Sequence, residues 1–84
     1  MPTIAFVDGV ALLIYPRDHV PPHVHARIAE HRCKLSIVTG QVIDGSLPPS
    51  KLRTVQAWLA AHRSEVAFAW DEIRNGRSII GMIE

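Results

Sequence analysis

Two neighbouring segments, residues 23–29 and 32–38, alternate between apolar and polar side chains along their length. Successive side chains of a strand point to opposite faces, so this alternation predicts two strands with one covered face each. If residues 30–31 form a two-residue turn, Ile28 pairs with Cys33, and both apolar rows lie on one face of a hairpin. Glu-His is not a preferred hairpin turn, so a longer loop with a shifted register stays open.

A second hairpin is predicted at the start of the chain. Asp8-Gly9 joins apolar runs at residues 3–7 and 10–15. This dipeptide favours a type I′ turn, which needs two residues with positive φ. The second run is apolar at every position, which predicts a strand covered on both faces by the domain itself or by a partner. A further short strand is expected at residues 41–43.

The C-terminal half shows helical periodicity. Apolar residues recur at helical spacing over residues 50–63 and again up to Asn75-Gly76, a pair typical of helix ends. Ser46 and Ser64 are the expected caps of these two helices. Strands followed by two helices predict a single α+β domain over residues 1–84, an antiparallel four- to five-stranded sheet packed against a C-terminal helical hairpin.

The core is expected between the sheet and the helices. Tyr15 and Trp58 are interpreted as packing residues, and residues 78–83 as an apolar tail that forms an edge strand or a docking segment. The side chains expected to be largely buried are Phe6, Leu13, Ile28, Leu35, Leu59, Val66 and Trp70.

Composition narrows the class of protein. The formal net charge of the 84 residues is only +1, so a nucleic-acid site must rest on local clustering of cations. The single cysteine, Cys33, excludes an internal disulfide framework and fits a reducing compartment. The start of the chain lacks the pattern of a signal peptide, and the longest apolar run, residues 10–15, is too short to cross a bilayer. A soluble cytoplasmic protein is expected.

The stretch from Asp18 to His25 concentrates the groups that could carry chemistry, because it holds three of the five histidines. His23 and His25 are two residues apart on a predicted strand and so share one face, opposite Val24. With His19 they could supply three imidazoles to a divalent metal such as zinc, and Asp18 could be a fourth ligand or orient an imidazole. The alternative is that these side chains cap loop carbonyls and pair across strands.

Acid–base chemistry on a phosphodiester is a second interpretation of the same region. With a two-residue turn at residues 30–31, His25 lies opposite Ser36, and Arg27 opposite Lys34. An imidazole can move protons, and fixed cations can stabilise the transition state, which is the combination that a ribonuclease needs. The candidate catalytic residues are His23, His25, Arg27 and Lys34.

Nucleic-acid binding without chemistry is a third interpretation. The candidate substrate-binding residues are Arg17, Arg32 and Ser36, beside the cations of the hairpin. Phosphate contacts from such a patch give salt-dependent affinity that ignores sequence. Exposed aromatic residues for base stacking are not expected. A solvated basic strand face is the alternative without function.

Several signatures spread over nearly the whole chain resemble the small bacterial family called domain of unknown function 4160. They are Met-Pro-Thr-Ile at the start, Asp18-His19-x-Pro-Pro-His23-x-His25, Gly45-x-Leu47-Pro48, Trp58-x3-His62-Arg63-x-Glu65 and Trp70. Arg27 departs from the family pattern, where an acidic residue is common, and so does Ala29-Glu30-His31, where a glycine usually helps the turn.

The resemblance implies a partner, a small protein of domain of unknown function 2442 encoded beside this one, in a two-gene toxin–antitoxin-like module. Two functional hypotheses follow. In the first, the chain is the toxin-like component and binds or cleaves RNA. In the second, it is a non-enzymatic interaction or regulatory domain whose histidines are structural or hold a metal. A domain this short also gains stability from a partner, so a homodimer is a further expectation.

Overall fold

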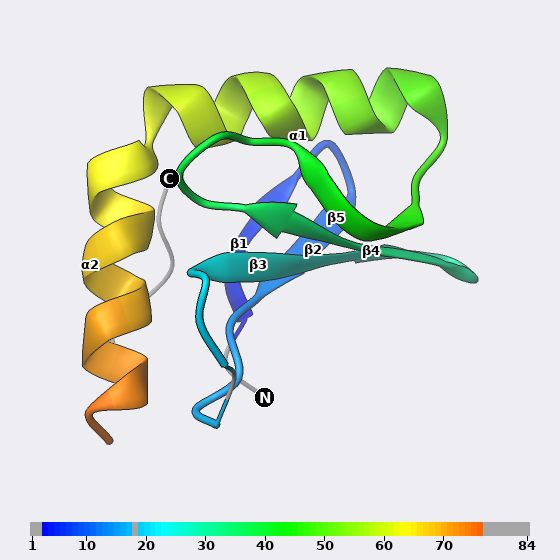
Figure 1. The fold of residues 1–84 in the computed structure, drawn as a ribbon. Helices are drawn as coiled ribbons and strands as arrows, with labels where there is room; N and C mark the ends of the chain where they lie inside the picture. Colours follow the sequence, from blue (N-terminus) through cyan, green and yellow to red (C-terminus); the bar gives the residue numbers. More distant parts are fainter. Residues whose placement is uncertain (1–2, 18, 77–84) are drawn as a thin grey trace.

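The computed structural model describes residues 3–17 and 19–76, and Figure 1 shows their arrangement. Five antiparallel strands form one sheet in the order β1-β2-β3-β4-β5, so neighbours in the chain are neighbours in the sheet. Two helices follow the last strand. The predicted α+β class is therefore confirmed, with five strands.

The first hairpin matches its prediction. β1 (Thr3–Val7) and β2 (Val10–Leu13) are joined by Asp8 and Gly9, whose φ angles of 51° and 82° are those that a type I′ turn requires. The Lys51 side chain holds this turn against the first helix, because its Nζ lies 3.0 Å from Asp8 Oδ2 and 2.9 Å from the Asp8 carbonyl oxygen. Adjacent residues of β2, Leu12 and Leu13, are both buried, which confirms a strand covered on both faces.

The pairing of β3 (His23–Ile28) with β4 (His31–Ser36) differs from the expected register by two residues. Ile28 pairs with His31, not Cys33, because the turn is at Ala29-Glu30, where Ala29 has φ 52°. A shift of two residues keeps every side chain on its face, so the alternation pattern could not distinguish the two registers.

The last strand extends further than expected. β5 (Val42–Ser46) continues through Asp44 and Gly45 to Ser46, so Ser46 is a strand residue and not a helix cap. α1 (Pro49–Ala61) begins after Pro48, which provides no side-chain cap, and proline instead occupies the first helical turn.

The two helices meet at a sharp corner. α2 (Arg63–Arg74) follows α1 with only His62 between them, and Figure 1 shows α2 turning away from α1 at this point. His62 Nδ1 donates to the Trp58 carbonyl oxygen at 3.0 Å, and its ring stacks on Trp58. Ser64 lies inside α2, so the expected cap is wrong. Asn75 ends α2 as predicted. No helix of the described residues is long and apolar enough to cross a membrane.

The core fills one face of the sheet, where both helices pack. Trp70, Leu59, Val66 and Leu35 are buried there, and Ile28 packs against them partly buried. Cys33 is buried in the same cluster, as expected.

The prediction that Phe6 is buried in the core is wrong, because its side chain is 62% exposed. In a regular strand Ile4 and Phe6 would share a face. The pairing of β1 with β2 is irregular between Thr3 and Ala5, and Ile4 and Ala5 are both buried. An irregularity of this kind adds a residue to one strand, so the positions after it change face. Ala5 and Val7 consequently point into the core, and Phe6 points away from it.

Candidate functional site

The face of the sheet opposite the core carries most of the candidate residues. Cross-strand partners share a face, so the register defines two rows. One row runs from Phe6 through Ala11, Arg27 and Arg32 to Ser46. The other runs from Leu13 through His25 and Lys34 to Asp44. We call these two rows the open face.

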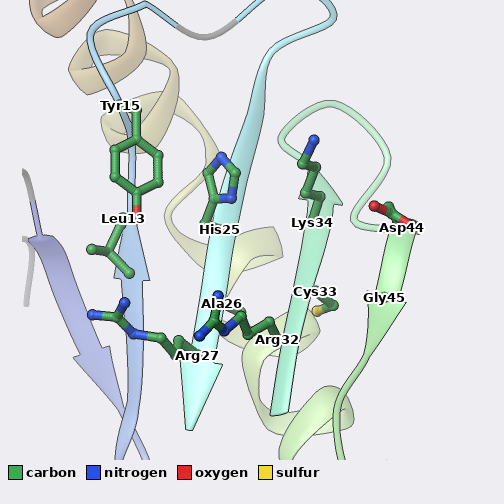
Figure 2. Close-up of a pocket in the computed structure, with 10 residues that line it drawn as sticks. All are labelled: Leu13, Tyr15, His25, Ala26, Arg27, Arg32, Cys33, Lys34, Asp44 and Gly45. Atoms are coloured by element: carbon green, nitrogen blue, oxygen red, sulfur yellow. The ribbon is translucent and has the colours of Figure 1, made fainter. Parts of the chain in front are cut away.

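A shallow pocket of about 320 Å³ lies in the open face, and Figure 2 shows the side chains around it. It spans β2 to β5, so it exists only once these four strands have paired. Leu13 is almost fully buried yet is not part of the helix-covered core, and it supplies apolar surface to the pocket. The residues that line the pocket are Leu13, Tyr15, His25, Ala26, Arg27, Arg32, Cys33, Lys34, Asp44 and Gly45.

Three cations surround this pocket. Arg27 and Lys34 are half-buried and Arg32 is exposed. None of the three forms an ion pair within 4.0 Å with a carboxylate of the described residues. Asp44 is the cross-strand partner of Lys34 but makes no such ion pair with it. The pocket therefore carries a net positive charge that is available to an anion from solution.

His25 and Tyr15 form the aromatic side of the pocket. Their ring centroids lie 4.7 Å apart in an edge-to-face arrangement, and the rings stand side by side in Figure 2. His25 lies opposite Lys34, whereas the sequence pattern placed it opposite Ser36, because the register is shifted by two residues. The residue paired with His25 on the neighbouring strand is thus a cation.

His23 has different surroundings from His25. It is almost fully buried, and its Nδ1 donates to the Pro21 carbonyl oxygen at 2.9 Å. Its ring lies 5.3 Å from the Trp70 ring and 5.2 Å from the His25 ring. His23 does not line the pocket, so its contacts tie the start of β3 to the preceding loop and to α2. It still shares a face with His25, opposite the buried Val24, as predicted.

The loop before β3 holds the remaining metal candidates. The peptide bond between Val20 and Pro21 is cis, and His19 is exposed. Asp18 lies outside the described residues. Among the residues that are described, no three of His, Cys, Asp and Glu are close enough to hold a metal ion. The four-ligand site therefore stays a prediction.

The candidate substrate-binding residues are separated. Arg32 lines the pocket, whereas Arg17 is exposed in the loop outside it. Ser36 pairs with His23, and its Oγ accepts hydrogen bonds from the backbone N–H groups of Val38 and Thr39, both at 3.1 Å. Ser36 thus holds the turn that leads toward β5.

Three residues of the pocket were not expected there from the sequence. Leu13 and Tyr15 were both assigned to the core between the sheet and the helices, but period-two spacing places them together on the opposite face of the sheet. Asp44 was assigned to a turn, and only the full length of β5 brings it beside Lys34.

Burial separates the Cys33 thiol from this chemistry. The residue contributes to the wall of the pocket, but it is only 4% exposed and belongs to the core cluster. Desolvation raises the pKa of the thiol above its ordinary value, so the neutral form is favoured. Cys33 is therefore a packing residue, as the sequence predicts.

Comparison with known proteins gives one match. The family model described as a domain of unknown function, number 4160, matches residues 9–71, which is three quarters of the chain and includes every residue of the pocket. Searches of the curated proteins and of the solved structures gave no significant match.

Proposed function

This chain belongs to the domain of unknown function 4160 family, and we propose that it is the toxin-like component of a two-gene module and binds RNA through its open face. The observation that carries the proposal is the group of three cations, Arg27, Arg32 and Lys34, around one pocket with no carboxylate of the described residues paired to them.

Phosphate is the anion that fits these groups best. A guanidinium offers a planar set of donors that can bind two phosphate oxygens at once, and a lysine adds a compact positive charge. Arg27 and Arg32 are direct cross-strand partners, and Lys34 is two residues along β4 from Arg32 on the same face. Three cations fixed on neighbouring strands favour a ligand with several phosphates in a row, which a nucleic-acid strand supplies.

Cleavage of the bound RNA is a second candidate function, and the placement of His25 beside Lys34 and Tyr15 favours it. In such a reaction the neutral imidazole takes the proton of a ribose 2′-hydroxyl. The 2′-oxygen then bonds to phosphorus and the bond from phosphorus to the 5′-oxygen breaks. The 5′-oxygen leaves with a proton from solvent water, and a 2′,3′-cyclic phosphate remains. Arg27 and Lys34 would stabilise the added negative charge of the transition state.

The resemblance supplies the proposed partner, the neighbouring small protein of domain of unknown function 2442. Such a partner would inhibit the chain by covering the open face. Under the competing hypothesis of a non-enzymatic interaction domain, the partner would bind the same face, but RNA would not.

RNA binding is tested by the anisotropy of a short fluorescent RNA at several salt concentrations. Replacement of Arg27, Arg32 or Lys34 by Gln should weaken binding. It should also reduce the slope of log Kd against log salt by about 0.7 for each phosphate that the protein no longer neutralises. Arg53→Gln is the matched control, because Arg53 is exposed on α1, which packs against the opposite face. An equal loss of affinity in Arg53→Gln, or none in the pocket variants, contradicts the proposal.

Toxicity and cleavage are tested by induced expression in a bacterial host. Wild type should arrest growth, the neighbouring gene should restore it, and His25→Ala should grow normally if cleavage causes the arrest. A His25→Ala variant that still binds RNA but no longer produces 2′,3′-cyclic ends would assign catalysis to the imidazole. Normal growth of wild type together with absence of RNA binding would leave the interaction-domain hypothesis.

A further inference from the structure

The exposed ring of Phe6 is the feature of the open face that phosphate binding does not explain. The side chain is 62% exposed, whereas its neighbours Ala5 and Val7 are buried. Removing a large apolar side chain from water is favourable by a few kcal/mol. A phenylalanine that the fold directs into solvent therefore offers that surface to a ligand.

The neighbours of Phe6 identify the chemistry of such a ligand. Its cross-strand partner is Ala11, whose own partner on the next strand is Arg27, followed by Arg32. Strands are spaced by about 4.8 Å, so the backbones at Phe6 and Arg27 are about 10 Å apart. Ala11 between them is small, so within the described part of this row no large side chain separates the aromatic ring from the cations. A sugar with the phosphates on either side of it can bridge this separation.

From this row of residues we infer that the open face takes single-stranded RNA, with one base stacked on Phe6 and the adjoining phosphates on Arg27 and Arg32. The inference rests on the proposed function and specifies the form of the RNA. Stacking needs a base whose face is accessible. In a duplex both faces are covered by neighbouring bases, and the A-form major groove is too narrow to be read.

A protein partner with an apolar surface, lacking the carboxylates that the proposed inhibitor would need for the cations, fits the same row less well. An apolar protein surface seated on Phe6 would also bury Arg27 and Arg32, and the burial of unpaired cations is costly. A ligand that carries flat apolar groups and regularly spaced negative charges can contact both Phe6 at one end of the row and the two arginines at the other. Single-stranded nucleic acid has this combination, and aromatic platforms beside a cationic groove are how proteins bind it.

The test compares one RNA sequence as a single strand and as a duplex with its complement, in the same anisotropy assay. Wild type should prefer the single strand. Phe6→Leu keeps an apolar side chain but removes the aromatic face, and it should weaken single-strand binding by about tenfold. It should leave duplex binding and the salt slope unchanged. Phe6→Trp should bind the single strand at least as tightly as wild type.

Phe68→Leu is the matched control, since Phe68 is also 62% exposed but lies on α2. It should bind like wild type, and thermal unfolding should show that both Leu variants stay folded. Wild-type affinity in Phe6→Leu, or a preference for the duplex, overturns this inference while the cation pocket remains a site for RNA. If wild type binds neither form of RNA, the proposed function fails and this inference fails with it.

Discussion

Trp70→Ala is expected to remove a large part of the stability of this domain. Trp70 is 3% exposed and belongs to the core cluster, and Arg74 lies over its ring at 5.3 Å. A tryptophan side chain buries about 200 Å². At about 25 cal/mol per Å² this burial corresponds to about 5 kcal/mol, in line with the about 3–5 kcal/mol typical of such truncations.

That cost is large beside the total. At about 0.05–0.15 kcal/mol per residue, a chain of 84 residues has a free energy of unfolding of about 4–13 kcal/mol. At the lower end of this range Trp70→Ala should be partly or wholly unfolded at room temperature, and at the upper end it should stay folded but unfold at a much lower urea concentration than wild type. Trp70→Phe keeps an aromatic ring and should lose only about 1–2 kcal/mol, which remains measurable in a folded protein.

Urea unfolding followed by far-ultraviolet circular dichroism is the suitable assay, because it does not depend on tryptophan emission. Phe68→Ala is the control within the same helix, since Phe68 is exposed, and it should change the free energy of unfolding by no more than about 0.5 kcal/mol. Equal urea midpoints for Trp70→Ala and Phe68→Ala would refute the packing of α2 against the sheet.

Three further predictions concern single positions. Asp44→Asn should tighten RNA binding, because the carboxylate lies opposite Lys34 and repels phosphate, and titration by anisotropy measures the change. Gly45→Ala should destabilise the fold, because Gly45 has φ 79° and a Cβ there would clash with the Arg32 carbonyl oxygen. The expected result is a lowered melting temperature. An unchanged melting temperature would contradict the close approach of β4 and β5. Cys33 should react with a thiol reagent only after unfolding. Burial raises the pKa of this thiol above the ordinary value of 9.0. The stability that the neutral thiol contributes is therefore complete below pH 9.0 and is lost as the pH rises through the raised native pKa. Unfolding curves of wild type and Cys33→Ala at alkaline pH would show this loss in wild type alone.

The sequence by itself determined the features that depend on neighbouring residues. Asp8-Gly9 specifies the first turn, because few other pairs adopt two positive φ angles without strain. Alternation in residues 23–28 specifies that Val24 and His25 point to opposite faces, since the period of a strand is two. The family signatures and the end of α2 at Asn75 were also legible in the chain.

Tertiary structure alone decided which candidate residues meet. The two possible registers of β3 and β4 place the same residues on the same faces, so the alternation pattern could not tell that Lys34 is the partner of His25, and only the paired strands of the folded sheet show it. The His23 and His25 rings remain 5.2 Å apart, but α2 brings Trp70, from far along the chain, against His23, and only His25 lines the pocket.

Phe6 shows the limit of pattern reasoning most clearly. An apolar residue in an apolar run is expected in the core, and nothing local marks the irregular pairing near Ala5. The helices lie beyond position 48, and their packing decides which face of the sheet is covered. The alternation within a strand shows only that one of its faces is more apolar than the other. The exposure of Phe6 beside the cations is therefore a property of the assembled sheet.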